Sequence, residues 1–234
     1  MLWYKKNIDL VSDYKATFSD DKTNVASEEK SKQEKAYEQA ADIRKFEIDK
    51  YWSRTGYFWA FIVSIYGAYF AVLTTMCKIE SNCQTPSFSH GEIPLLILAG
   101  LGLFFSFLWY LANKASRHWQ ENWEEHMNLL EDEITGPLYK TFLADKSYSV
   151  SGINILASKV ISFCAYFLLQ FEFMSFVKAK IFDNNTENRT ALSLSLTIVF
   201  SIITLIALYV ISINVHGNRS AAGKLSFVQK IYAE

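Results

Sequence analysis

The sequence predicts an all-α integral membrane protein with four transmembrane helices, the first two of which extend into a cytoplasmic helical hairpin. Two observations predict this fold: four apolar stretches are long enough to span a bilayer, and helix-forming, charged segments flank the first two. A hydrocarbon core of about 30 Å needs roughly 20 residues of α-helix. The formal net charge of the 234 residues is −1, which gives no electrostatic reason to expect nucleic acid as a partner.

The first two spans follow a polar start of the chain. Residues 1–26 form a polar leader, in which we expect a short helix and no cleavable signal peptide. Residues 27–55 are rich in Ala, Glu, Lys and Gln and contain no Pro, which predicts a cytoplasmic helix that runs unbroken into the first span. That span covers residues 56–76 without a formal charge. An outer loop at residues 77–92 then leads to the second span at residues 93–113.

The second span continues as a cytoplasmic amphipathic helix over residues 114–135, and Gly136-Pro137 ends it. Five apolar side chains at helical spacing form one face: Trp119, Trp123, Met127, Leu130 and Ile134. This face is covered either by the other helix of the hairpin or by a neighbouring subunit. Because two antiparallel helices cannot fully cover two Trp side chains, we expect a homo-oligomer.

The second half of the chain contains the other two spans. A cytoplasmic connector at residues 136–152 leads to the third span at residues 153–177. An outer loop at residues 178–190 joins it to the fourth span at residues 191–215, and a cytoplasmic tail follows at residues 216–234.

The distribution of Lys and Arg predicts the orientation. With both termini inside, eighteen cationic residues lie on the cytoplasmic side and four on the outer side. The positive-inside rule favours this arrangement. A re-entrant third stretch would instead place the C-terminus outside.

Polar residues within the last two spans are the candidate functional residues. Lys159 and Glu172 lie about 20 Å apart along a helix, so they cannot pair within one span. Each lies near an end of the span, and we favour anchoring at the interfaces over an ion pathway. The fourth span carries hydroxyl side chains on one face: Ser193, Thr197, Ser201, Thr204 and Ser212. We favour interhelical hydrogen bonds over a channel lining for this face, because no charged ring accompanies it.

The sequence gives no support for catalysis. His118 and His126 lie eight residues apart, about 12 Å along a helix, so they cannot share a metal ion within one chain. The zinc-protease, phosphate-loop and serine-hydrolase motifs are absent. We expect no catalytic residue, no cofactor and no metal.

Two cysteines share the predicted first outer loop. The separation of Cys77 and Cys83 permits a disulfide in an oxidising periplasm, and we favour that bond over two free thiols.

Two stretches resemble the RipA family of octameric membrane proteins. They are FEIDKYWSRTGYFWAF and LGLFFSFLWYLANKASRHWQENWEEHMNLLEDEITGPLYKT, and the resemblance covers about residues 46–154. It implies a small bacterial inner-membrane protein that forms a homo-oligomer, and RipA itself is tied to bacterial adaptation inside host cells. The resemblance supplies no catalytic residue.

We therefore expect a non-enzymatic oligomeric protein of the bacterial inner membrane, a scaffold or a component of stress or host adaptation. The alternative is an oligomeric channel or membrane-permeabilising effector that uses the polar face of the third and fourth spans. The lipid bilayer and further copies of the chain are the expected partners, and the sequence identifies no partner protein.

Overall fold

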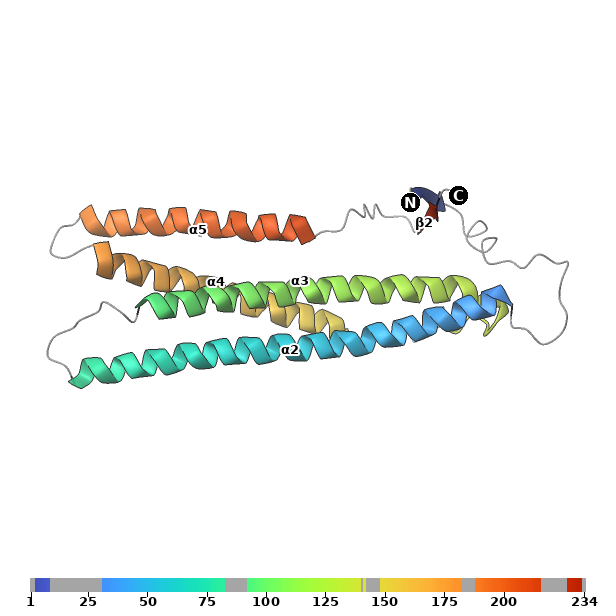
Figure 1. Ribbon diagram of the computed structural model, residues 1–234, viewed down its shortest axis with the longest axis horizontal. Helices are drawn as coiled ribbons and strands as arrows, with labels where there is room; N and C mark the ends of the chain where they lie inside the picture. Colours follow the sequence, from blue (N-terminus) through green and yellow to red (C-terminus); the bar gives the residue numbers. More distant parts are fainter. Residues whose placement is uncertain are drawn as a thin grey trace. The chain divides into compact units, whose positions relative to one another are not determined.

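The computed structural model describes residues 3–8, 31–82, 92–139, 141, 148–181, 188–215 and 227–232. Its main elements are four long helices, which are α2 (Lys32–Asn82), α3 (Glu92–Leu130), α4 (Val150–Ile181) and α5 (Asn188–Val215) (Figure 1). All four are long and apolar enough to cross a membrane. The predicted all-α membrane fold with four spans is confirmed.

One small element outside the helices joins the two ends of the chain. Strand β1 (Trp3–Ile8) pairs in antiparallel orientation with strand β2 (Phe227–Tyr232). The expectation of a short helix in the leader is therefore wrong for residues 3–8. Both strands are rich in aromatic and β-branched residues, which favour extended structure, and each finds its hydrogen-bonding partner only at the other end of the sequence.

The chain divides into two compact units. The hairpin unit comprises residues 1–50, 116–147 and 217–234, and the membrane unit comprises residues 51–115 and 148–216.

Helix α2 begins at a side-chain cap. The Ser31 hydroxyl accepts a hydrogen bond from the Glu34 N–H at 3.1 Å, which satisfies one of the free donors of the first turn. The helix then continues without a break to Asn82, past the predicted end of the first span at residue 76. Residues 77–82 contain neither Gly nor Pro, so nothing in them stops the helix.

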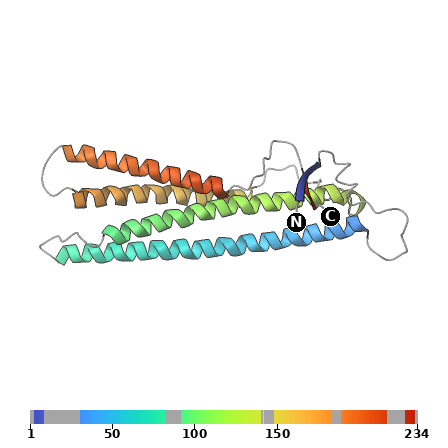
Figure 2. The same cartoon turned by 45° about the horizontal axis from the view of Figure 1, so that its top comes forward.

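Helix α3 carries one buried stripe along most of its length. The buried residues alternate at spacings of four and three, as in the seam of a coiled coil: Leu95, Ala99, Gly102, Ser106, Trp109, Asn113 and Ser116, then Met127 and Leu130 in the same register. Figure 2 shows α3 running beside α2. The predicted apolar face begins with Trp119, but the buried side of α3 passes through Ser116, and Trp119 itself is exposed.

A buried glutamate organises the turn that ends α3. The N–H groups of Ile134, Thr135 and Gly136 all donate to the backbone carbonyl of Glu131. The Glu131 carboxylate, which is fully buried, accepts the Tyr139 N–H at 2.6 Å. Gly136 has a φ of 71°, a left-handed conformation that suits glycine. Helix α3 itself ends at Leu130, five residues before the predicted end at residue 135, and Gly136 lies in the turn that follows it.

The core of the membrane unit contains small and branched side chains. Ala99 and Leu103 of α3 form one buried cluster with Ala165 and Leu169 of α4. Helix α5 lies beside α4 (Figure 2). The rings of Phe173 on α4 and Phe200 on α5 stack with their centroids 3.9 Å apart.

Candidate functional site

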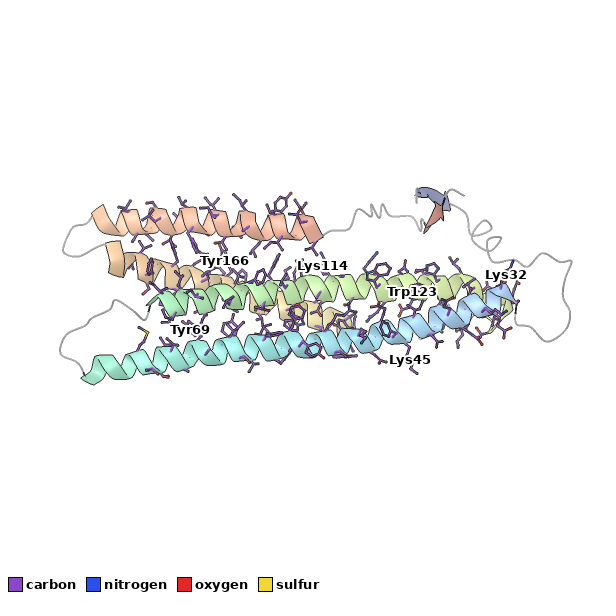
Figure 3. The ribbon with its side chains drawn as sticks, in the orientation of Figure 1. Lys32, Lys45, Tyr69, Lys114, Trp123 and Tyr166 are labelled. Atoms are coloured by element: carbon purple, nitrogen blue, oxygen red, sulfur yellow. The ribbon has the colours of Figure 1, made fainter. Side chains whose placement is uncertain are left out.

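Glu172 is held inside the membrane unit by a tyrosine of another helix. The Tyr69 hydroxyl on α2 donates to Glu172 Oε1 on α4 at 2.6 Å, and Glu172 is only 6% exposed. Tyr69 is labelled in Figure 3. The carboxyl group of Glu172 lies within the bundle, and its anchoring at an interface stays a prediction. A tyrosine in an apolar span was the available signal, since a buried hydroxyl needs a partner.

A second polar cluster joins three helices. The Asn154 side chain on α4 donates to the Tyr51 hydroxyl on α2 at 2.8 Å. Asn113 on α3 donates to the Ser158 hydroxyl and to the Asn154 carbonyl, both at 3.3 Å. The sequence analysis did not identify these contacts. Asn113 within the buried stripe was the available signal, because a buried amide has to find partners.

The two clusters set the alignment of α2 with α4. Tyr51 contacts Asn154 and Tyr69 contacts Glu172, and both pairs are 103 positions apart in the sequence. Since all α-helices have the same rise per residue, the two helices run parallel with a constant offset. Each residue of α4 therefore lies at about the same depth as the residue of α2 that is 103 positions earlier.

Lys159 lies apart from both clusters. Its side chain is exposed on α4, whereas Glu172 is buried. The structure therefore does not bring the two charged residues together. An exposed lysine near the start of a span can extend its ammonium group toward the interface.

The hydroxyl residues of α5 lie on its covered side. Ser193 is buried, and the remaining four are half-buried: Thr197, Ser201, Thr204 and Ser212. Ser201 is hydrogen-bonded to Tyr166 of α4, which is labelled in Figure 3. The hydroxyls of Thr197 and Thr204 each donate to a backbone carbonyl four residues earlier, at 2.8 Å. The bond between Ser201 and Tyr166 joins two packed helices, whereas the bonds of Thr197 and Thr204 stay within α5.

The opposite side of α5 consists largely of bulky apolar side chains. Its exposed residues include Leu194, Ile198, Ile202, Leu205, Ile206 and Tyr209. Such a surface suits contact with lipid chains.

The predicted apolar face of the hairpin is covered in part. Met127 and Leu130 are buried, and Leu130 packs against Ala36 and Tyr37 of α2. Trp123 and Ile134 are half-buried, whereas Trp119 remains 37% exposed. The same chain therefore covers the later part of the face and leaves its first residue accessible.

Polar contacts hold the two helices of the hairpin together. Arg44 of α2 donates from Nε and Nη2 to Glu124 Oε1 of α3, at 3.1 and 2.7 Å. Gln33 of α2 donates to the Leu130 carbonyl at 3.0 Å. His126 lies beside Trp123, with ring centroids 5.2 Å apart, and burial lowers its pKa below the usual value of 6.5.

The described residues offer no constellation for a metal. Within that part of the chain, no three or more His, Cys, Asp or Glu side chains could hold an ion together. Cys164 is an exposed free thiol on α4. The side chains of Cys77 and Cys83 lie outside the described part, so their disulfide stays a prediction.

The family model of the octameric membrane protein family (8xMP) matches residues 34–175. The match contains nearly all of α2, all of α3 and most of α4, and it extends beyond residues 46–154, where we saw the resemblance. Helix α5 lies outside it. No curated protein and no solved structure matches the chain.

Proposed function

The chain belongs to the octameric membrane protein family (8xMP), and from this premise we propose that it acts as an octameric, non-enzymatic scaffold in the bacterial inner membrane. The membrane unit anchors and assembles the subunits. The hairpin unit lies in the cytoplasm and offers its surface to partner proteins.

The orientation rests on the distribution of positive charge. Eighteen Lys and Arg residues lie in the segments placed inside and four in those placed outside. This difference favours cytoplasmic termini under the positive-inside rule. The exposed Trp119 is then accessible from the cytoplasm, where an aromatic side chain at a surface suits a protein contact.

The hydrogen bonds made by the polar side chains within the spans are the observation that favours a scaffold over a channel. Glu172 is bonded to Tyr69, and Ser201 is bonded to Tyr166. A channel lining would present such groups to water along a path. Here they join helices of one chain, and the exposed side of α5 is apolar.

Ion flux into liposomes tests this choice. Liposomes that contain the purified full-length oligomer should take up potassium or protons no faster than protein-free liposomes, while a known cation channel sets the upper limit. Replacing Thr197 and Thr204 by Val and Ser201 by Ala should leave this low flux unchanged. Flux above the protein-free level that falls in the triple variant would instead support the channel.

A role in stress or host adaptation is the wider part of the proposal, and it comes from the resemblance to the RipA family. Deleting the gene should impair growth of the bacterium inside host cells but not in rich medium. Complementation by the wild-type chain should restore growth, whereas normal intracellular growth of the deletion strain would contradict this role.

A further inference from the structure

The side of α2 that faces away from its own bundle is made of small residues. They recur at spacings of three and four and are all exposed: Ser53, Gly56, Ala60, Ser64, Gly67, Ala71 and Thr74. The opposite side of the same helix is buried and contains Tyr51, Ile62 and Tyr69. A Cβ atom placed on Gly56 or Gly67 would have no described atom within 4 Å. The described residues of the chain therefore leave the space above this side unoccupied.

This face differs from the other exposed helix sides of the membrane unit. Helix α5 presents bulky apolar side chains, whereas small residues in a span allow another helix backbone to approach closely. Gly102 of α3 is already covered by a side chain of α2, because a Cβ there would lie 2.9 Å from the Tyr66 hydroxyl. Exposed aromatic residues flank the small face of α2: Trp52, Tyr57, Trp59, Phe61 and Phe70. We call the small face and these flanks the α2 groove.

We propose that the α2 groove receives helix α4 of the neighbouring copy of this chain, and that this contact, repeated around a ring, assembles the octamer. The inserted surface is the exposed ridge of α4, which contains Leu156, Val160, Phe163, Phe167 and Phe171. These side chains also lie at spacings of three and four, so they form a continuous ridge along one side of the helix.

The extent of the family match selects α4 over α5 as the inserted helix. An interface common to an octameric family has to lie within the part of the chain that defines the family. Residues 34–175 contain the whole α2 groove and the whole α4 ridge but no residue of α5. The apolar side of α5 is then left to face lipid.

The offset between α2 and α4 within one chain also predicts which residues of the two helices meet between neighbouring copies. Copies related by rotation about the membrane normal lie at the same depth, so the offset of 103 positions between α2 and α4 also holds for neighbouring copies. Three ridge side chains then lie level with three small residues: Leu156 with Ser53, Phe163 with Ala60, and Phe167 with Ser64. Phe171 lies level with Ala68, so four of the five ridge side chains meet small residues, while Val160 lies level with Tyr57 at the flank of the groove.

Two different surfaces on each copy give a closed ring. A head-to-tail contact of this kind continues from copy to copy until the rotation closes, whereas a contact of the α2 groove with itself would make pairs. The inference rests on the octameric assembly of the family and not on the scaffold role. An octamer that conducts ions would refute the scaffold and leave this contact standing.

The same substitution on two exposed sides tests the groove. Ala60→Leu fills the α2 groove, and Ala207→Leu adds the same atoms to the exposed side of α5. Native mass spectrometry of the full-length variants in detergent should find that Ala60→Leu loses the octamer and that Ala207→Leu keeps it. An intact octamer in Ala60→Leu, or a loss of equal extent in both variants, would overturn the proposal.

Cysteine cross-linking identifies the helix that occupies the groove. Cys77, Cys83 and Cys164 are first replaced by Ser, and the octamer is verified. Ala60→Cys combined with Phe163→Cys should then give a ladder of cross-linked species up to eight copies on oxidation. The control pair, Ala60→Cys with Leu205→Cys on α5, should give no ladder. Dimers from Ala60→Cys alone would show that two grooves meet, and a ladder in the control pair would place α5 in the groove; either result overturns the proposal.

Discussion

A carboxyl group placed inside a helix bundle needs a hydrogen-bond donor, and Tyr69 supplies one to Glu172. Asn113, Asn154 and Ser158 satisfy one another in the same way at the other polar cluster. Each of these residues has a partner on another helix, and Ser158 also donates to the Ile155 carbonyl of its own helix. Single substitutions at these positions should therefore affect the packing of the whole membrane unit.

Tyr69→Phe should destabilise the membrane unit, because it leaves the buried Glu172 oxygen without its donor. The expected loss is about 1–3 kcal/mol, the usual cost of an unsatisfied buried polar group. Thermal unfolding in detergent should show a lower midpoint for Tyr69→Phe and an unchanged midpoint for Tyr209→Phe, whose side chain is exposed on α5. Equal midpoints for both variants would show that the Tyr69 bond contributes nothing.

Acid should weaken the hairpin unit through His126. Burial holds the pKa of His126 in the folded chain below its unfolded value of about 6.5, so the unfolded state binds more protons between the two values. The contribution of His126 is complete above pH 6.5 and is lost as the pH falls through the folded pKa. The stability of His126→Gln should show a smaller decrease between pH 7 and pH 5 than that of the wild type. A decrease of the same size in both proteins would assign the pH dependence to other groups.

At the scale of the helix, the contacts between α2 and α3 in the hairpin unit combine an apolar seam with an ion pair. Arg44 reaches Glu124 through two nitrogen atoms and also lies 5.7 Å from the Tyr139 ring. By contrast, Arg117 and Glu121 pair within α3 alone. Only the first pair joins two helices.

A double-mutant cycle on Arg44→Glu and Glu124→Arg should measure this contact. Each single reversal places like charges together and should cost about 0.2–1 kcal/mol, as for other exposed ion pairs, while the double reversal should recover most of the loss. The coupling should decrease at high salt. Reversal of Arg117 and Glu121 provides the matched control, with a coupling of about 0.3–0.5 kcal/mol. Additive losses in the Arg44 cycle would contradict a direct contact.

The positions of the helices could be predicted from the sequence, but the contacts between them could not. Apolar length predicted the four spans, because that signal is local, whereas α3 ends at Leu130 and not at the predicted residue 135 before Gly136. The partner of Glu172 lies on a helix that is distant in the sequence, as does the partner of Ser201, so no spacing along one helix could reveal either. The β1–β2 ribbon was missed for the same reason, since its strands lie at opposite ends of the chain. Small residues such as Gly67 were visible in the sequence, but only the structure shows that the described part of the chain leaves them uncovered.

At the scale of the whole molecule, the exposed sides of the membrane unit differ in the size of their side chains. Bulky apolar residues cover α5, a ridge of bulky residues runs along α4, and small residues line the α2 groove. Glu172 and Ser201 are each bonded to a tyrosine on another helix of the same chain. These features together lead to an octamer that is held by contacts between α2 and α4 and does not need a water-filled path.

Electron cryo-microscopy of the full-length octamer in a lipid nanodisc tests this account most directly. We expect eight copies in a ring, with the ridge of α4 from each copy in the α2 groove of the next, α5 facing lipid, and the hydroxyl residues of α5 packed against α4. A ring in which Ser201 and Thr204 face a continuous water-filled pore, or in which α5 forms the contact between copies, would contradict it.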